Sequence, residues 1–130
     1  MAVNPYDKMR QNAIYTMPPE ELTLMLYDGA LKFCNQAMIA MEAKDYEKTN
    51  NLVQRLQDII REFQMTLKME YDISHQMNDM YNYMHELLIE ANMKKDTAML
   101  EEVRGYVRDF RDTWKEAVHI ARTQPATAKK

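Results

Sequence analysis

The sequence is poor in the residues that end helices or cross-link a chain. It holds two glycines, four prolines and one cysteine among 130 residues. Strand-rich folds need more glycine and proline for their turns, so this scarcity favours helices. The single cysteine, Cys34, cannot form an intramolecular disulfide and has no neighbouring base in the sequence, so we expect an inert thiol in a reducing compartment.

An excess of basic residues is also missing. Lysine and arginine number 17 against 20 aspartates and glutamates, which gives a formal net charge of −3. Because proteins that bind nucleic acid contact phosphates through lysine and arginine, we expect no nucleic-acid partner. The sequence shows no basic stretch followed by an apolar run at its start, and no apolar run long enough to cross a bilayer. We therefore expect a soluble, cytoplasmic protein without membrane insertion.

Catalytic and metal-binding motifs are incomplete. His85 begins a segment that resembles the helix of zinc proteases, but Ile89 stands where a second histidine would have to bind the metal. Helix bundles can also hold metals with two Glu-x-x-His pairs, and this sequence offers one such pair and one approximation. These are Glu116 with His119, and Asp72 with His75. We expect no enzyme activity, no metal and no other cofactor, and we keep a metal-binding four-helix oxidoreductase as the alternative.

Four segments do show the apolar periodicity of amphipathic helices. The predicted helices cover Pro19–Met41, Tyr46–Met69, Ile73–Met93 and Thr97–Arg122. Proline is tolerated in a first helical turn, Asp45 can cap the second helix, and either Asp96 or Thr97 can cap the fourth. The connectors are short, over residues 43–45, 70–72 and 94–96, so consecutive helices should run antiparallel.

These features predict an all-α fold, a single domain over residues 1–130 that forms an antiparallel up-down-up-down four-helix bundle. Residues 1–16 are expected to form a mobile N-terminal arm or a short cap helix, and residues 123–130 a disordered tail. Gly29 lies on the apolar stripe of the first helix, where glycine costs about 1 kcal/mol relative to alanine. We interpret it as a point of close helix–helix approach, and the alternative is a floor for a partner's side chain.

The second and third predicted helices carry more apolar residues than one narrow stripe requires. Val53 and Ile60 widen the stripe of the second helix, and the third adds residues outside its stripe. The 13 methionines supply flexible side chains of the kind found on adaptable binding surfaces. Each such residue is more simply explained as core, but together they predict a groove for the amphipathic helix of a partner. We hypothesise that large residues of the arm, among them Tyr6 and Ile14, cover that groove until the partner arrives.

Several motifs, in their order and spacing, resemble the FliS family of chaperones for flagellin secretion. Residues 19–33 (PEELTLMLYDGALKF) resemble the family's first-helix signature, residues 80–84 (MYNYM) its third helix and residues 110–115 (FRDTWK) its fourth. The resemblance extends from Asn4 to about Ala121. It departs at Pro18, where the family often has serine, and in the connector after the second helix, where the family often has glycine.

The resemblance implies a cytoplasmic export chaperone that binds its client, the C-terminal segment of flagellin, and prevents premature polymerisation. It also implies delivery of the client to the flagellar type III export apparatus, at the cytosolic domain of the gate protein FlhA, and displacement of the arm by the client. A regulatory adaptor for another flagellar protein is a further alternative, and the oligomeric state, including a weak homodimer, stays open.

The expected client contacts come from the first three helices, and Leu26, Phe63 and Met84 among them also suit core positions. The full set is Leu22, Leu26, Tyr27, Ile59, Phe63, Tyr81, Met84 and Leu88. For the displaceable arm, we expect Tyr6 and Ile14 to make the contacts.

Overall fold

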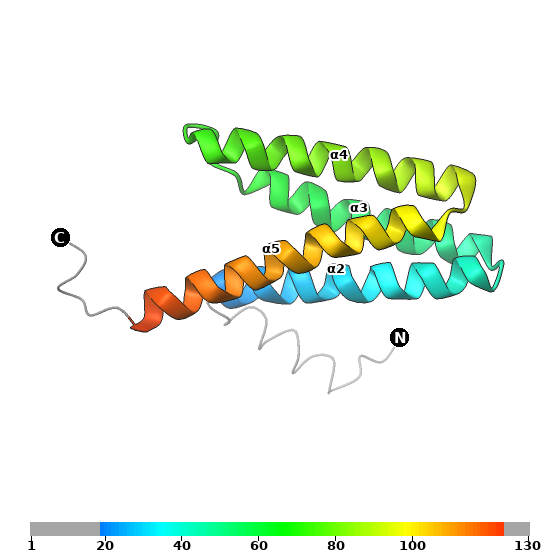
Figure 1. The fold of residues 1–130 in the computed structure, drawn as a ribbon, viewed down its shortest axis with the longest axis horizontal. Helices are drawn as coiled ribbons and strands as arrows, with labels where there is room; N and C mark the ends of the chain where they lie inside the picture. The colour runs from blue at the N-terminus through cyan, green and yellow to red at the C-terminus, as the bar shows by residue number, and fades with distance from the viewer. Residues whose placement is uncertain (1–18, 124–130) are drawn as a thin grey trace, which may run out of the picture.

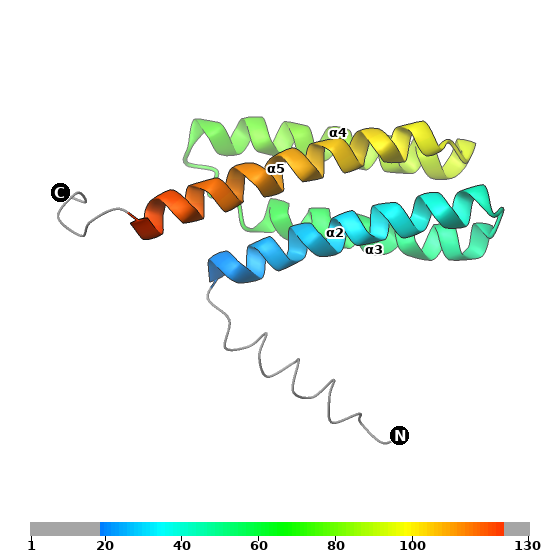
Figure 2. The same cartoon turned by 60° about the horizontal axis from the view of Figure 1, so that its bottom comes forward.

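The computed structural model describes residues 19–123, which form four α-helices (Figure 1). α2 spans Pro19–Glu42, α3 Tyr46–Met65, α4 Asp72–Lys94 and α5 Thr97–Thr123. Each helix packs against the next one in the chain, and α5 returns along α2, so the four helices close into a ring (Figure 2). The predicted all-α bundle is confirmed in this part of the chain. None of these four helices is long and apolar enough to cross a lipid bilayer.

The connectors at one end of the bundle are tight and capped. Between α2 and α3, Lys44 adopts the left-handed conformation with a φ of 60°. The Asp45 side chain accepts a hydrogen bond from the Lys48 N–H at 3.2 Å, which confirms the predicted N-cap. At the start of α5, Asp96 accepts a hydrogen bond from the Ala98 N–H at 2.9 Å. Of the two predicted caps for this helix, Asp96 is therefore the one that binds the backbone.

The connector between α3 and α4, at the opposite end, is longer than predicted. α3 ends at Met65 and not at Met69, because the next two N–H groups bond carbonyls three residues back instead of four. The Thr66 hydroxyl donates to the Phe63 carbonyl oxygen at 2.7 Å, and such a bond competes with continuation of the helix. Residues 66–71 therefore leave the helix although their apolar residues continue its pattern, and the predicted three-residue connector is wrong.

The core is one cluster of buried apolar side chains from all four helices. Its largest fully buried members are Tyr81, Leu56, Ile60, Met84, Leu88, Leu100, Val53, Val103 and Val107. Val53 and Ile60 are thus core residues, whereas Ile59 is only partly buried. Val53 and Ile60 lie on the buried face of α3, so they do not supply the apolar surface surplus that the sequence suggested.

Gly29 does not mark a close approach of two helices, contrary to our prediction. A Cβ atom placed on it would lie 3.9 Å from Ile59 Cδ1, which is an ordinary van der Waals distance. The contact between α2 and α3 therefore has room for alanine at this position.

Candidate functional site

A cleft of about 640 Å³ opens at the end of the bundle that carries the α3–α4 connector. All four helices and the connector contribute to its walls. The lining residues are Thr23, Tyr27, Phe63, Thr66, Leu67, Lys68, Tyr71, Ser74, Met77, Tyr81 and Trp114. Because apolar and aromatic side chains predominate, the cleft is suited to apolar side chains of a partner.

Stacked aromatic rings form the floor of this cleft. The rings of Tyr27 and Phe63 stack with their centroids 4.4 Å apart, and Phe63 stacks on Tyr81 at 5.9 Å. Phe110 meets Tyr81 edge to face at 5.6 Å. Because Tyr27, Phe63 and Tyr81 are all buried, the stack belongs to the core, and a partner can reach only its outer edge.

Two phenol groups add polarity to the floor. The hydroxyl oxygens of Tyr27 and Tyr81 lie 3.5 Å apart. Burial raises the pKa of both phenols, and the proximity of Tyr27 raises the pKa of Tyr81 further. Both groups therefore stay protonated at neutral pH, where they can form hydrogen bonds but carry no charge.

Exposed apolar side chains surround the mouth of the cleft. Tyr71 lines the mouth and is 56% exposed, and Met69 and Ile73 flank it in the sequence with exposures of 43% and 59%. Met65, at the end of α3, is more exposed still. Apolar side chains gathered in this way around one connector are typical of a protein-binding surface.

Trp114 joins this cleft to a second apolar cleft. Its indole N–H donates a hydrogen bond to the Glu20 carbonyl oxygen at 2.9 Å, which fixes α5 on the first turn of α2. The second cleft, of about 320 Å³, is lined by Glu20, Trp114, Ala117, Val118, Ala121 and Arg122. Here α5 runs on beyond the other helices (Figure 1), and its last buried residue is Val107. Within residues 19–123, the apolar face of α5 beyond Trp114 is therefore largely uncovered.

The structure brings three of the predicted client contacts together, because Tyr27, Phe63 and Tyr81 all line the main cleft. Three others are partly buried on α2 and α3 and line neither apolar cleft. These are Leu22, Leu26 and Ile59.

The remaining predicted contacts are less accessible. Met84 and Leu88 are fully buried in the core, so a client reaches them only if the bundle opens. The arm residues Tyr6 and Ile14 lie outside the described residues. All of these client contacts remain predictions.

The predicted set omits the residues that form the mouth and walls of the cleft. Leu67 and Tyr71 lie in the connector, and Met77 and Trp114 follow the stripes of their helices. A signal for the first two is present in the sequence. Apolar residues continue through the connector, where a solvent-facing turn would normally carry polar ones.

Groups that could support catalysis are scattered over the described helices. Among residues 19–123, no three His, Cys, Asp or Glu side chains lie close enough together to hold a metal ion. Cys34 is fully buried, and burial raises the pKa of its thiol to about 12, which is consistent with a thiol of low reactivity. His85 Nε2 donates to Gln64 Oε1 at 2.9 Å, and His119 is exposed as predicted.

The chain matches a family model described as flagellar protein FliS over residues 2–121. It is similar to the flagellar secretion chaperone FliS of Bacillus subtilis (strain 168), with 48% identity over 92% of this chain and 90% of that protein. It is also similar to the flagellar secretion chaperones FliS of Campylobacter jejuni (29% identity, covering 85% and 88% of the two chains) and Escherichia coli K12 (26%, covering 83% and 82%). The match includes α2, α3, α4 and most of α5.

Proposed function

The chain belongs to the FliS family, and from this premise we propose that it is a flagellar secretion chaperone whose client is the C-terminal segment of flagellin. It acts in the cytoplasm, where it keeps that segment from polymerising before export. It works by binding alone, without catalysis. The observation that carries this proposal is the apolar cleft at the α3–α4 end and its continuation along α5.

An apolar cleft suits a client that is disordered before it binds and amphipathic when it folds. Ordering such a segment costs on the order of 2 to 5 kcal/mol, which burial of roughly 1,000 to 3,000 Å² offsets. The main cleft, at about 640 Å³, accommodates only a few side chains. The client must therefore continue along the uncovered face of α5, with Trp114 at the junction and Tyr71 at the mouth.

The same proposal gives the N-terminal arm a role. α2 begins at Pro19, and Thr23 near its start lines the cleft, so the N-terminal end of the described helices lies beside the cleft. In the free chaperone, Tyr6 and Ile14 cover the cleft, and the client displaces them on binding.

Delivery to the export apparatus completes the proposed role. The loaded chaperone carries its client to the cytosolic domain of the export gate protein FlhA. An adaptor role toward other flagellar regulators is compatible with the same fold. Membership of the FliS family supports both roles.

Calorimetric titration with a peptide that covers the last ~40 to 50 residues of flagellin from the same bacterium tests the proposal. We expect tight binding of one peptide per chain, a negative heat-capacity change and a gain of helical circular dichroism. A peptide of equal length from the N-terminal end of the same flagellin is the matched control. Failure of the C-terminal peptide to bind, or equal binding of both peptides, would contradict the proposed client.

A further inference from the structure

A groove of about 440 Å³ between α2 and α5 carries positive charge on an acidic protein. Four cationic side chains line it against the single carboxylate of Asp28, while the whole chain has a formal net charge of −3. The cations are Lys32 of α2 and Arg104, Arg108 and Arg111 of α5. This basic groove shares no lining residue with the two apolar clefts.

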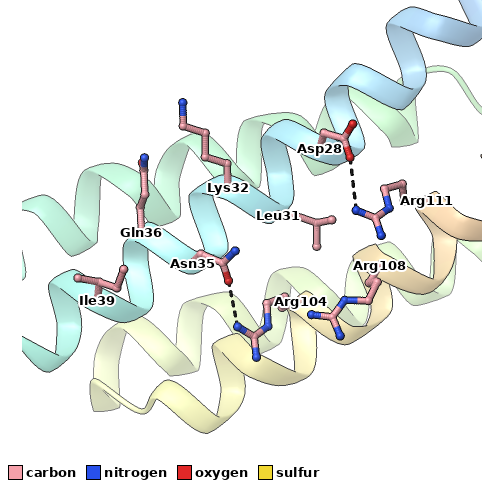
Figure 3. Close-up of a pocket in the computed structure, with 9 residues that line it drawn as sticks. All are labelled: Asp28, Leu31, Lys32, Asn35, Gln36, Ile39, Arg104, Arg108 and Arg111. Atoms are coloured by element: carbon pink, nitrogen blue, oxygen red, sulfur yellow. Dashed lines mark hydrogen bonds and ion pairs between the residues drawn. The ribbon is translucent and has the colours of Figure 1, made fainter.

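The three arginines follow one another along the side of α5 that faces α2 (Figure 3). Arg104 donates to Asn35 Oδ1 at 2.9 Å, and Arg111 pairs with Asp28 at 3.5 Å. Arg108 lies between them, is exposed, and forms no hydrogen bond or ion pair within residues 19–123. The two outer arginines are therefore held in place by α2, and the middle guanidinium is left free for a ligand.

The basic groove offers apolar contacts beside its charges. Leu31 of α2 points toward α5 and is almost buried, at 9% exposure, whereas Ile39 of α2, at one end of the groove, is 67% exposed. The planar guanidinium of arginine can pair with a carboxylate through two parallel hydrogen bonds. Cationic and apolar positions side by side fit a peptide in which acidic and apolar residues alternate along one helical face.

The ends of this chain do not complement the basic groove. Residues 1–18 contain one acidic and two basic side chains, and residues 124–130 contain two lysines and no acidic residue. Both ends carry the same sign of charge as the groove, so electrostatics favour another molecule as the occupant.

A nucleic acid is a poor match for the same groove. Two further carboxylates lie at its rim, where Glu101 contacts Arg104 and Asp112 contacts Arg111. A phosphate backbone would meet these carboxylates and a protein of negative net charge. A helical peptide can instead place a carboxylate at Arg108, the arginine that these carboxylates leave unpaired, and keep the rest of its contacting face apolar.

We propose that the basic groove binds an acidic, amphipathic helical segment of a partner protein, independently of the apolar clefts. The partner's carboxylates pair first with Arg108, and Arg104 and Arg111 on either side of it add to the attraction. Its apolar residues contact Ile39 and the accessible edge of Leu31. The chaperone then has two separate protein-binding surfaces, one apolar and one basic.

Fluorescence anisotropy with a labelled synthetic helical peptide tests this proposal on the full chain. The peptide carries glutamates at the spacing of the three arginines, with leucines beside them, and its glutamine counterpart is the control probe. We expect saturable binding of the glutamate peptide only, which weakens at about 0.5 M salt as charges are screened. Arg108→Glu should weaken binding about tenfold, because it replaces attraction by repulsion at the centre of the groove.

Two controls separate the groove from general charge effects. Arg108 has no partner to lose, so thermal unfolding of Arg108→Glu should match that of the wild type. Lys115→Glu makes the same charge change at an exposed position of α5 outside the groove, and it should bind the peptide like the wild type. Equal weakening by both variants would overturn the proposal.

Other outcomes would also overturn it. These are absence of saturable binding by the glutamate peptide, tighter binding of a single-stranded oligonucleotide or of inorganic phosphate, and self-association of the chain that Arg108→Glu abolishes.

A second titration uses the chain saturated with the flagellin peptide. Unchanged affinity supports two independent surfaces, and mutual exclusion contradicts them. The anisotropy titration with the glutamate peptide does not require flagellin binding. Failure of the proposed function would therefore be distinguishable from failure of the basic-groove proposal.

Discussion

The indole N–H of Trp114 donates a hydrogen bond to the Glu20 carbonyl oxygen at 2.9 Å and so links the exposed half of α5 to the first turn of α2. Arg122 of α5 pairs with Glu20 and Glu21 in the same region. Together these contacts hold the wall that the two apolar clefts share.

Trp114→Phe keeps an aromatic ring in this wall but removes the hydrogen bond. We expect the free energy of unfolding to fall by about 1 kcal/mol, because the Glu20 carbonyl loses its donor from α5. Urea unfolding followed by circular dichroism measures this change. An unfolding free energy equal to that of the wild type would mean that the bond does not hold α5 on α2.

Gly29→Ala should stabilise the protein. Alanine is favoured over glycine inside a helix by about 1 kcal/mol, and the new Cβ would lie at an ordinary contact distance of 3.9 Å from Ile59 Cδ1. Gly105→Ala is the matched control, because its Cβ would meet nothing within 4 Å, and it should gain a similar amount. If only Gly29→Ala lowered the urea midpoint, the close helix approach suggested by the sequence would be correct after all.

Stability should decline in mildly acidic solution, in part through His85. Burial lowers the pKa of His85 below its usual value of 6.5, and the charge of Arg61 lowers it further. The unfolded chain therefore takes up this proton at a higher pH than the folded chain, so protonation favours unfolding. The contribution of His85 to stability is complete above about pH 6.5 and is lost as the pH falls toward the lower value of the folded state.

His85→Gln removes this titration, so its urea midpoint should fall less than that of the wild type between about pH 7 and pH 5. His119→Gln replaces an exposed histidine, and its urea midpoint should change with pH in the same way as that of the wild type. Parallel pH curves for all three proteins would show that His85 contributes nothing to the acid sensitivity.

The sequence predicted the bundle because each helix must bury one apolar face, and that requirement leaves a periodic pattern. It predicted the Asp45 cap because the side chain and the helix start are neighbours in the chain. It could not show which side of the α3 stripe is buried deepest. Val53 and Ile60 are buried and Ile59 is only partly buried, and this difference depends on how α3 packs against α2 and α4, which no local pattern records.

The cleft was harder to predict for a related reason. A single side-chain hydrogen bond, from Thr66 to the Phe63 carbonyl, accompanies the early end of α3. The residues that follow, including Leu67 and Tyr71, then line the cleft instead of extending the helix. The basic groove was not predicted at all, because Lys32 and the arginines of α5 are far apart in the sequence and meet only when α5 packs on α2.

Tyr71 gives the most direct test of the claim that the α3–α4 end of the bundle binds the client. The measurement is a calorimetric titration of the wild type, Tyr71→Ala and Tyr46→Ala with the C-terminal flagellin peptide. Tyr46 is the matched control, because it is a similarly exposed tyrosine at the start of α3, at the opposite end of the bundle. We predict about tenfold weaker binding for Tyr71→Ala, since exposed aromatic residues often dominate interface energies, and wild-type affinity for Tyr46→Ala. Equal affinities for all three proteins would contradict the claim.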